Sequence, residues 1–100
     1  MSDGVSGPHL ARLLAAHPNP FNPSAEIGIE LSRASTVRLC VFDTRGRVIR
    51  VLFAGRCSSG CHTKVWDGRD EHGLAMPSGV YFVLLEAEGT QEVQKIAMVK

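Results

Sequence analysis

The stretch TVRLCVFDTRGRVIRVLF, residues 36–53, decides the fold that the sequence predicts. In its first half, apolar side chains occupy every second position from Val37 to Val41, which is the period of a β-strand with one buried face. DTRGR then supplies a turn, in which Gly46 is expected to provide a positive φ and Asp43 to hydrogen-bond the backbone. The run VIRVLF that follows is rich in β-branched residues and predicts the returning strand.

Four other short runs have the composition of strands. They are AEIGIELS, CHTKVWD, VYFVLLEA and EVQKIAMVK, at residues 25–32, 61–67, 80–87 and 92–100. Turn signals separate the runs at intervals of about 8–12 residues, and no segment has the pattern of a long helix. The segment LARLLAA, residues 10–16, is open to two interpretations, a short helix or an edge strand. The sequence therefore predicts an all-β fold, an immunoglobulin-like antiparallel β-sandwich of about seven strands.

Length and charge narrow the classes of function. One hundred residues suffice for one domain, and a net charge of +1 gives no electrostatic argument for nucleic acid or an anionic membrane. The longest apolar runs, such as Val80 to Leu85, are too short to span a bilayer. Residues 1–9 have the composition of a linker, and residues 10–100 that of the folded domain. The N-terminus lacks a basic region, so any export signal is expected elsewhere, on a longer parent chain.

Five motifs, in order along the chain, carry a resemblance to a known family. They are PNPFNPS, VRLCVFDTRGRVIRVL, GCHTKVWDGRDEHG, SGVYFVLLEA and QKIAMVK, which begin at residues 18, 37, 60, 78 and 94. Together they resemble the type A C-terminal sorting domain of bacterial type IX secretion substrates, over about residues 17–100. The Trp-Asp-Gly loop is also similar to the immunoglobulin-like domain of the flagellar hook-capping protein. The resemblance assigns structural motif positions to Asn19, Pro20, Phe21, Asn22, Pro23, Asp43, Gly46, Trp66, Asp67, Gly68, Gly79 and Tyr81.

The PNPFNP motif also has a structural interpretation. Its prolines fix φ and withhold amide donors, so the segment is suited to cross a sheet edge without continuing a ladder. Asn19 and Asn22 are expected to cap turns, and Phe21 is expected to fill the end of the core. The alternative is a surface that a secretion receptor recognises.

Two aromatic side chains and an acidic loop complete the set of motifs. Trp66 is expected to be buried with its indole N–H on a carbonyl oxygen, and Tyr81 invites comparison with a tyrosine corner. The carboxylates of Asp67, Asp70 and Glu71 raise the alternative of a calcium site, but their spacing is not that of an EF-hand loop. Core packing and a plain structured loop are the preferred interpretations.

The segment CSSGCH, residues 57–62, is the strongest candidate for metal or redox chemistry. Haem attachment normally needs two residues between the cysteines, whereas three separate Cys57 from Cys61. Zinc would need further good ligands beside these side chains. Two interpretations stay open, a disulfide between Cys57 and Cys61 across a tight turn, or two free thiols. Cys40 is expected to be inert on the strand face opposite the main core row, and no cofactor is predicted.

No Ser-His-Asp set, nucleophile elbow, phosphate loop or catalytic carboxylate pair is recognisable, so the sequence predicts a non-catalytic protein. The resemblance implies a sorting and anchoring module that directs a larger exoprotein, through the periplasm and the type IX machinery, to the cell surface. In that interpretation Lys95 and Lys100 belong to the surface that secretion proteins recognise. The alternative is a structural protein-interaction domain like that of the flagellar hook-capping protein. A carbohydrate-binding sandwich is disfavoured, because it calls for a row of exposed aromatic side chains.

Overall fold

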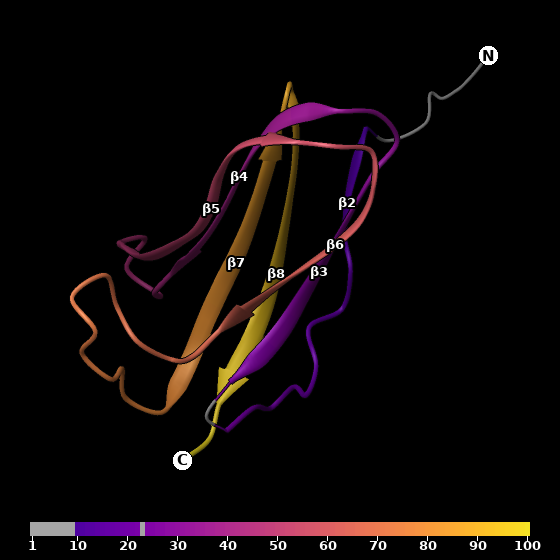
Figure 1. Ribbon diagram of the computed structural model, residues 1–100. Coiled ribbons are helices and arrows are strands. Elements are labelled where there is room, and N and C mark those ends of the chain that lie inside the picture. Colours follow the sequence, from indigo (N-terminus) through magenta and orange to yellow (C-terminus); the bar gives the residue numbers. More distant parts are fainter. Residues whose placement is uncertain (1–9, 23) are drawn as a thin grey trace.

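The computed structural model describes residues 10–22 and 24–100, which form two antiparallel sheets without a helix (Figure 1). The three-stranded sheet has the order β2-β3-β6, and the four-stranded sheet has the order β5-β4-β7-β8. The strands are β2 (Ala11–Leu13), β3 (Ala25–Leu31), β4 (Ser35–Phe42), β5 (Val48–Cys57), β6 (Gly60–Trp66), β7 (Gly79–Ala87) and β8 (Thr90–Met98). The predicted all-β sandwich of about seven strands is confirmed.

The N-terminal part of the described chain resolves one open interpretation. LARLLAA contributes the edge strand β2 and not a helix, and β2 pairs with β3 in antiparallel register. The predicted linker, residues 1–9, lies outside the described residues. No helix long and apolar enough to cross a membrane occurs in the part of the chain that the structure describes.

The core lies between the two sheets and is built by alternate residues of each strand. In β3 the side chains of Ile27 and Ile29 are fully buried, whereas Glu26 is exposed. In β7 the side chains of Val83 and Leu85 are fully buried as well. Full burial of such a side chain stabilises a fold by about 1.5–3 kcal/mol, so the alternation fixes which face of each strand turns inward.

The β4–β5 hairpin turn is organised by Asp43. Its Oδ1 atom accepts hydrogen bonds from the Arg45 and Arg47 amides at 2.9 and 3.0 Å. The Arg47 amide, together with the Arg47 guanidinium, lowers the pKa of Asp43. Gly46 has a φ of 82°, a left-handed conformation that residues with a Cβ rarely adopt.

Side chains of the edge strand β8 hydrogen-bond to the end of β2 and to the segment that follows it. The Glu92 carboxylate accepts a hydrogen bond from the Leu13 amide at 2.5 Å. The Gln94 side chain accepts one from the Ala16 amide at 2.6 Å and donates one to the Leu14 carbonyl at 2.8 Å. These bonds of the Glu92 and Gln94 side chains close the sandwich along one side.

The CSSGCH segment crosses from one sheet to the other. β5 ends at Cys57 and pairs with β4, whereas β6 begins at Gly60 and pairs with β3. Cys57 is buried in the core cluster, Cys61 is exposed, and both thiols are free. The disulfide interpretation of Cys57 and Cys61 is therefore wrong for this structure, because the flanking strands do not form the hairpin that it required.

Candidate functional site

The loop that joins β6 to β7, residues 67–78, is held at both ends by buried aromatic side chains. Trp66 is fully buried, and its Nε1 atom donates a hydrogen bond to the Arg69 carbonyl at 2.9 Å. The Tyr81 hydroxyl donates to the Pro77 carbonyl at 2.6 Å, which is the arrangement of a tyrosine corner. Burial is the main cause that raises the pKa of Tyr81, so the hydroxyl remains a donor at neutral pH.

Phe21 joins these two side chains in one aromatic cluster. The Phe21 ring centroid lies 5.4 Å from that of Trp66, and the Tyr81 ring meets Trp66 edge-on at 5.0 Å. The Phe21 amide donates to the Ala97 carbonyl, and the Phe21 carbonyl accepts from the Val99 amide, both at 2.9 Å. The motif residue therefore connects the anchors of the loop to the end of β8.

The other residues of the PNPFNP motif have separate places. Asn19 Oδ1 accepts a hydrogen bond from the Ala97 amide at 3.0 Å, so Asn19 caps the edge of β8 and does not cap a turn. Pro20 and Asn22 are exposed, and Pro23 lies outside the described residues. The segment thus leads from β2 to β3 along the edge of the opposite sheet.

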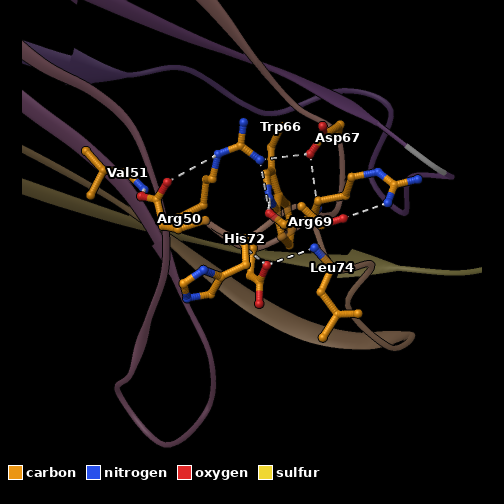
Figure 2. A network of polar contacts seen from close by, with 10 residues as sticks. Arg50, Val51, Trp66, Asp67, Arg69, His72 and Leu74 are labelled. Atoms are coloured by element: carbon orange, nitrogen blue, oxygen red, sulfur yellow. Dashed lines mark hydrogen bonds and ion pairs between the residues drawn. The ribbon is translucent and has the colours of Figure 1, made fainter.

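Arg50 of β5 fastens the loop to the four-stranded sheet (Figure 2). Its Nη1 atom lies 3.2 Å from both Asp67 Oδ1 and the Arg69 carbonyl oxygen, and its Nε atom lies 3.8 Å from Glu71 Oε1. Glu71 Oε2 accepts a hydrogen bond from the Val51 amide at 2.7 Å. The loop therefore covers the edge of β5 at this point and satisfies an amide that the sheet leaves unpaired.

Asp70 shapes the tip of the loop. Its Oδ1 atom accepts hydrogen bonds from the Leu74 and His72 amides, both at 2.9 Å, and these bonds, that of Leu74 first, lower the pKa of Asp70. Gly68 has a φ of 78°, and its carbonyl accepts a bond from the Met76 amide at 2.8 Å. In residues 10–22 and 24–100, no three side chains of the metal-binding types converge. The carboxylates of the loop are occupied in holding its backbone.

Sequence reasoning missed the two side chains that tie the loop down. The local sequence predicts no role for Arg50, and for Glu71 it suggests only the alternative of a calcium ligand. The one available signal was an arginine inside the apolar run VIRVLF, a position at which a charge requires a partner. Its partners are 17 and 21 residues away in sequence, and the strand pairing alone brings them near.

The family model described as the FlgD Ig-like domain matches residues 17–91, a span that contains the hairpin, the aromatic cluster and the loop. The chain belongs to the FlgD Ig-like domain family. Basal-body rod modification protein FlgD of Salmonella typhimurium is 39% identical over 92 residues, and that of Escherichia coli strain K12 is 36% identical over 69. These matches cover 89% and 66% of this chain but 40% and 30% of the relatives, so the chain spans less than half the length of FlgD.

Two solved structures share the fold of this FlgD Ig-like domain. Dimeric latent PorU from Porphyromonas gingivalis matches with a TM-score of 0.70 and 21% identity, over 98% of this chain and 10% of PorU. PorZ, a surface component of the type IX secretion system of the same bacterium, matches with a TM-score of 0.57 and 20% identity, over 86% of this chain and 11% of PorZ. At these identities the likeness shows the fold alone.

The remaining predicted positions of the FlgD Ig-like domain lie near its C-terminal strand. Gly79 begins β7. Lys95 is exposed on β8 opposite Phe82, whereas Lys100 is exposed beyond the strand, with its amide on the Ser78 hydroxyl at 3.1 Å. The two lysines therefore lie in different surroundings, one on a sheet face and the other at the chain end.

Proposed function

We propose that this FlgD Ig-like domain is a non-catalytic structural module that binds another protein through its β6–β7 loop. The observation that carries the proposal is the Arg50 network, which fixes the loop over the edge of β5. Leu74, at the tip, is 65% exposed while its amide is bonded to Asp70. An apolar side chain on a fixed backbone loses little conformational freedom when a partner binds, which favours recognition.

The titratable groups support a role without catalysis. Backbone amides lower the pKa values of Asp43 and Asp70, so neither carboxyl group is suited to donate a proton near neutral pH. Burial raises the pKa of the Cys40 thiol, which keeps it protonated and a poor nucleophile.

Site-specific photo-cross-linking of the parent protein in its host cell tests the proposal. A photoreactive residue in place of Leu74 is expected to give a discrete adduct with another protein, and Arg50→Ala is expected to abolish this adduct because it releases the loop. The control carries the same photoreactive residue in place of Thr63, which is exposed on β6. Equal adducts from the two positions, or no adduct from position 74, would contradict the proposal.

A second candidate function is the sorting of a larger exoprotein by the type IX machinery to the cell surface. The favouring observation is the docking of the PNPF motif on β8, where Asn19 and Phe21 bond to the backbone of the strand that leads to Lys100. The first motif and the last strand of the pattern are thus in direct contact. PorZ, a component of that secretion system, shares the fold.

An export assay separates the two candidates. Residues 10–100 are fused behind a fluorescent reporter with a periplasmic signal, in a bacterium with a working type IX system. Surface or medium fluorescence that is trapped in the periplasm of a translocon mutant would support sorting. Retention of a folded fusion in the periplasm of both strains would refute sorting and leave the interaction module.

A further inference from the structure

The outward face of the four-stranded sheet is apolar over much of its length. Two neighbouring rows of cross-strand partners cover it, Val48, Phe42, Phe82 and Lys95 in one row and Val51, Cys40, Leu84 and Val93 in the next. Val48, Val80 and Val93 are 49%, 39% and 58% exposed. The Phe42 and Phe82 rings stack with their centroids 6.1 Å apart. We call this surface, made by the two rows and Val80, the apolar face.

The outward face of the three-stranded sheet has a different composition. Arg12 and Glu30 form an ion pair at 3.7 Å across β2 and β3, and Glu26 and Thr63 are exposed beside them. Val65, 56% exposed, lies among these polar side chains. The polar side chains of this face are well solvated by water. Contiguous exposed apolar surface, as on the apolar face, marks an interaction site.

Both edges of the four-stranded sheet are bonded over part of their length. Asn19 and Phe21 hydrogen-bond to the outer edge of β8 at Ala97. On the other edge, the Glu71 carboxylate accepts a hydrogen bond from the Val51 amide. Addition of a further strand is thereby hindered at both sides, so a partner meets this sheet through its face.

We propose that the apolar face is the interface of a symmetric dimer of two copies of this chain. A two-fold axis parallel to the strands, between β4 and β7, lays β4 of one copy over β7 of the other. Phe42 then meets Phe82 of the partner subunit, and Arg38 meets Glu86 of the partner subunit.

Charge complementarity selects this axis. Arg38 Nη1 and Glu86 Oε1 of one copy are 3.5 Å apart, and they form the row next to the apolar rows. Two copies related by the axis place four charges in alternating order. An axis at right angles to the strands would lay this charged row over the aromatic row and desolvate both charges with no added partner from the other copy. Lys95 ends its row at the rim, where its stem covers apolar surface while its ammonium group reaches water.

The outward face of the four-stranded sheet, which comprises the apolar face and the neighbouring row of Arg38 and Glu86, is large enough for a stable dimer. Its strands have eight to ten residues. With about 4.8 Å between strands and about 3.3 Å per residue, four such strands have a flat footprint of roughly 19 by 30 Å. That is on the order of the ~800 Å² of accessible surface that each partner contributes to a standard interface. The net charge of +1 adds little repulsion between copies.

Sedimentation equilibrium of the full 100-residue chain tests the proposal with two matched variants. We expect a reversible dimer whose dissociation constant rises about tenfold or more in Val93→Lys, because an ammonium group enters an apolar interface. Val65→Lys changes a valine of nearly equal exposure on the other sheet and is expected to leave the dissociation constant unchanged. A chain that is monomeric at every concentration, or equal weakening by the two variants, overturns the proposal.

A charge exchange tests the axis itself. Arg38→Glu and Glu86→Arg each set like charges opposite one another in a homodimer, so each variant alone is expected to dimerise more weakly. In a mixture both contacts become complementary, and the heterodimer is expected to be favoured by about tenfold over either homodimer. Circular dichroism verifies that both variants are folded. Random mixing overturns the axis. The face is distinct from the β6–β7 loop, so failure here leaves the proposed function standing.

Discussion

The two outward faces of the sandwich are made by strands with the same alternation, yet their compositions differ. The three-stranded sheet turns Arg12, Glu26 and Glu30 to solvent, whereas the four-stranded sheet turns valines and phenylalanines outward. Both inner faces are apolar, because each must bury against the other. Folding thus accounts for the inner faces, and solvation accounts for the polar outer face. The apolar face requires a further cause, which the proposed dimer supplies.

Thiol labelling is expected to show the largest difference between the two faces. Cys61 and Cys40 both have outward parity, on the three-stranded and the four-stranded sheet, but Cys61 is exposed and Cys40 is 1% exposed. Cys61 is expected to react with a thiol reagent in the native protein. Cys40 and buried Cys57 are expected to react only on opening, on the order of a thousandfold more slowly. Time-resolved mass spectrometry of the labelled peptides measures the rates, and fast labelling of Cys40 would contradict its burial beneath its neighbours on the apolar face.

Truncation of one fully buried core side chain is compared with truncation of one side chain on the apolar face. Trp66→Ala is expected to lower the free energy of unfolding by about 3–5 kcal/mol, because Trp66 is fully buried and also bonds the loop. Phe82→Ala, on the apolar face, is the comparison and is expected to lose less than half as much in dilute solution. Urea unfolding measures both values. Equal losses would mean that Phe82 is as tightly packed in the monomer as the core.

Two carboxylates, Glu71 of the loop bonded to β5 and Glu26 on β3, provide a smaller comparison. Glu71→Ala is expected to cost about 1 kcal/mol, since the Val51 amide loses its acceptor, and the 50% exposure of the Glu71 side chain limits the effect. The control is Glu26→Ala on the polar face, where a 57% exposed carboxylate lies 3.7 Å from His17. Its expected change is within about 0.5 kcal/mol. Urea unfolding of the two variants checks the order, and a larger loss in Glu26→Ala would reverse it.

Low pH is expected to have the smallest effect on stability, through the Asp70 carboxylate of the loop. The folded-state pKa of Asp70 lies below its ordinary value of 3.8, chiefly because the Leu74 amide bonds the carboxylate. The stability that this provides is present above pH 3.8 and is lost as pH falls through the lower folded-state pKa. Below this pH, the stability of Asp70→Asn is therefore expected to decrease less steeply with falling pH than that of the wild type. Thermal unfolding at a series of pH values measures the slopes, and identical slopes would contradict the assignment.

The inner faces were predictable from the sequence because burial imposes a period of two residues. The alternation around Ile27 and Ile29 predicted β3 with its correct inward face. The same reasoning placed Cys40 on the opposite face from the core row of β4. Family motifs and local turn chemistry predicted the hairpin turn at Asp43.

Features that depend on pairing between distant strands were not predictable in this way. Whether CSSGCH turns back or crosses between sheets is set by the separate partners of β5 and β6, which the local sequence does not encode. The bonds of Arg50 to Asp67 and Glu71 depend on the same arrangement. The contiguity of Phe42 with Phe82 became visible only with the register of β4 against β7.

The most direct test of the difference between the two outer faces is a valine-methyl NMR spectrum at low and high protein concentration. Val48, Val80 and Val93 lie on the apolar face, and Val65 lies on the polar one with similar exposure. The dimer predicts that the methyl signals of the first three shift together as concentration rises, while those of Val65 stay in place. Signals that do not depend on concentration, or a shift of Val65 equal to that of Val93, would contradict it.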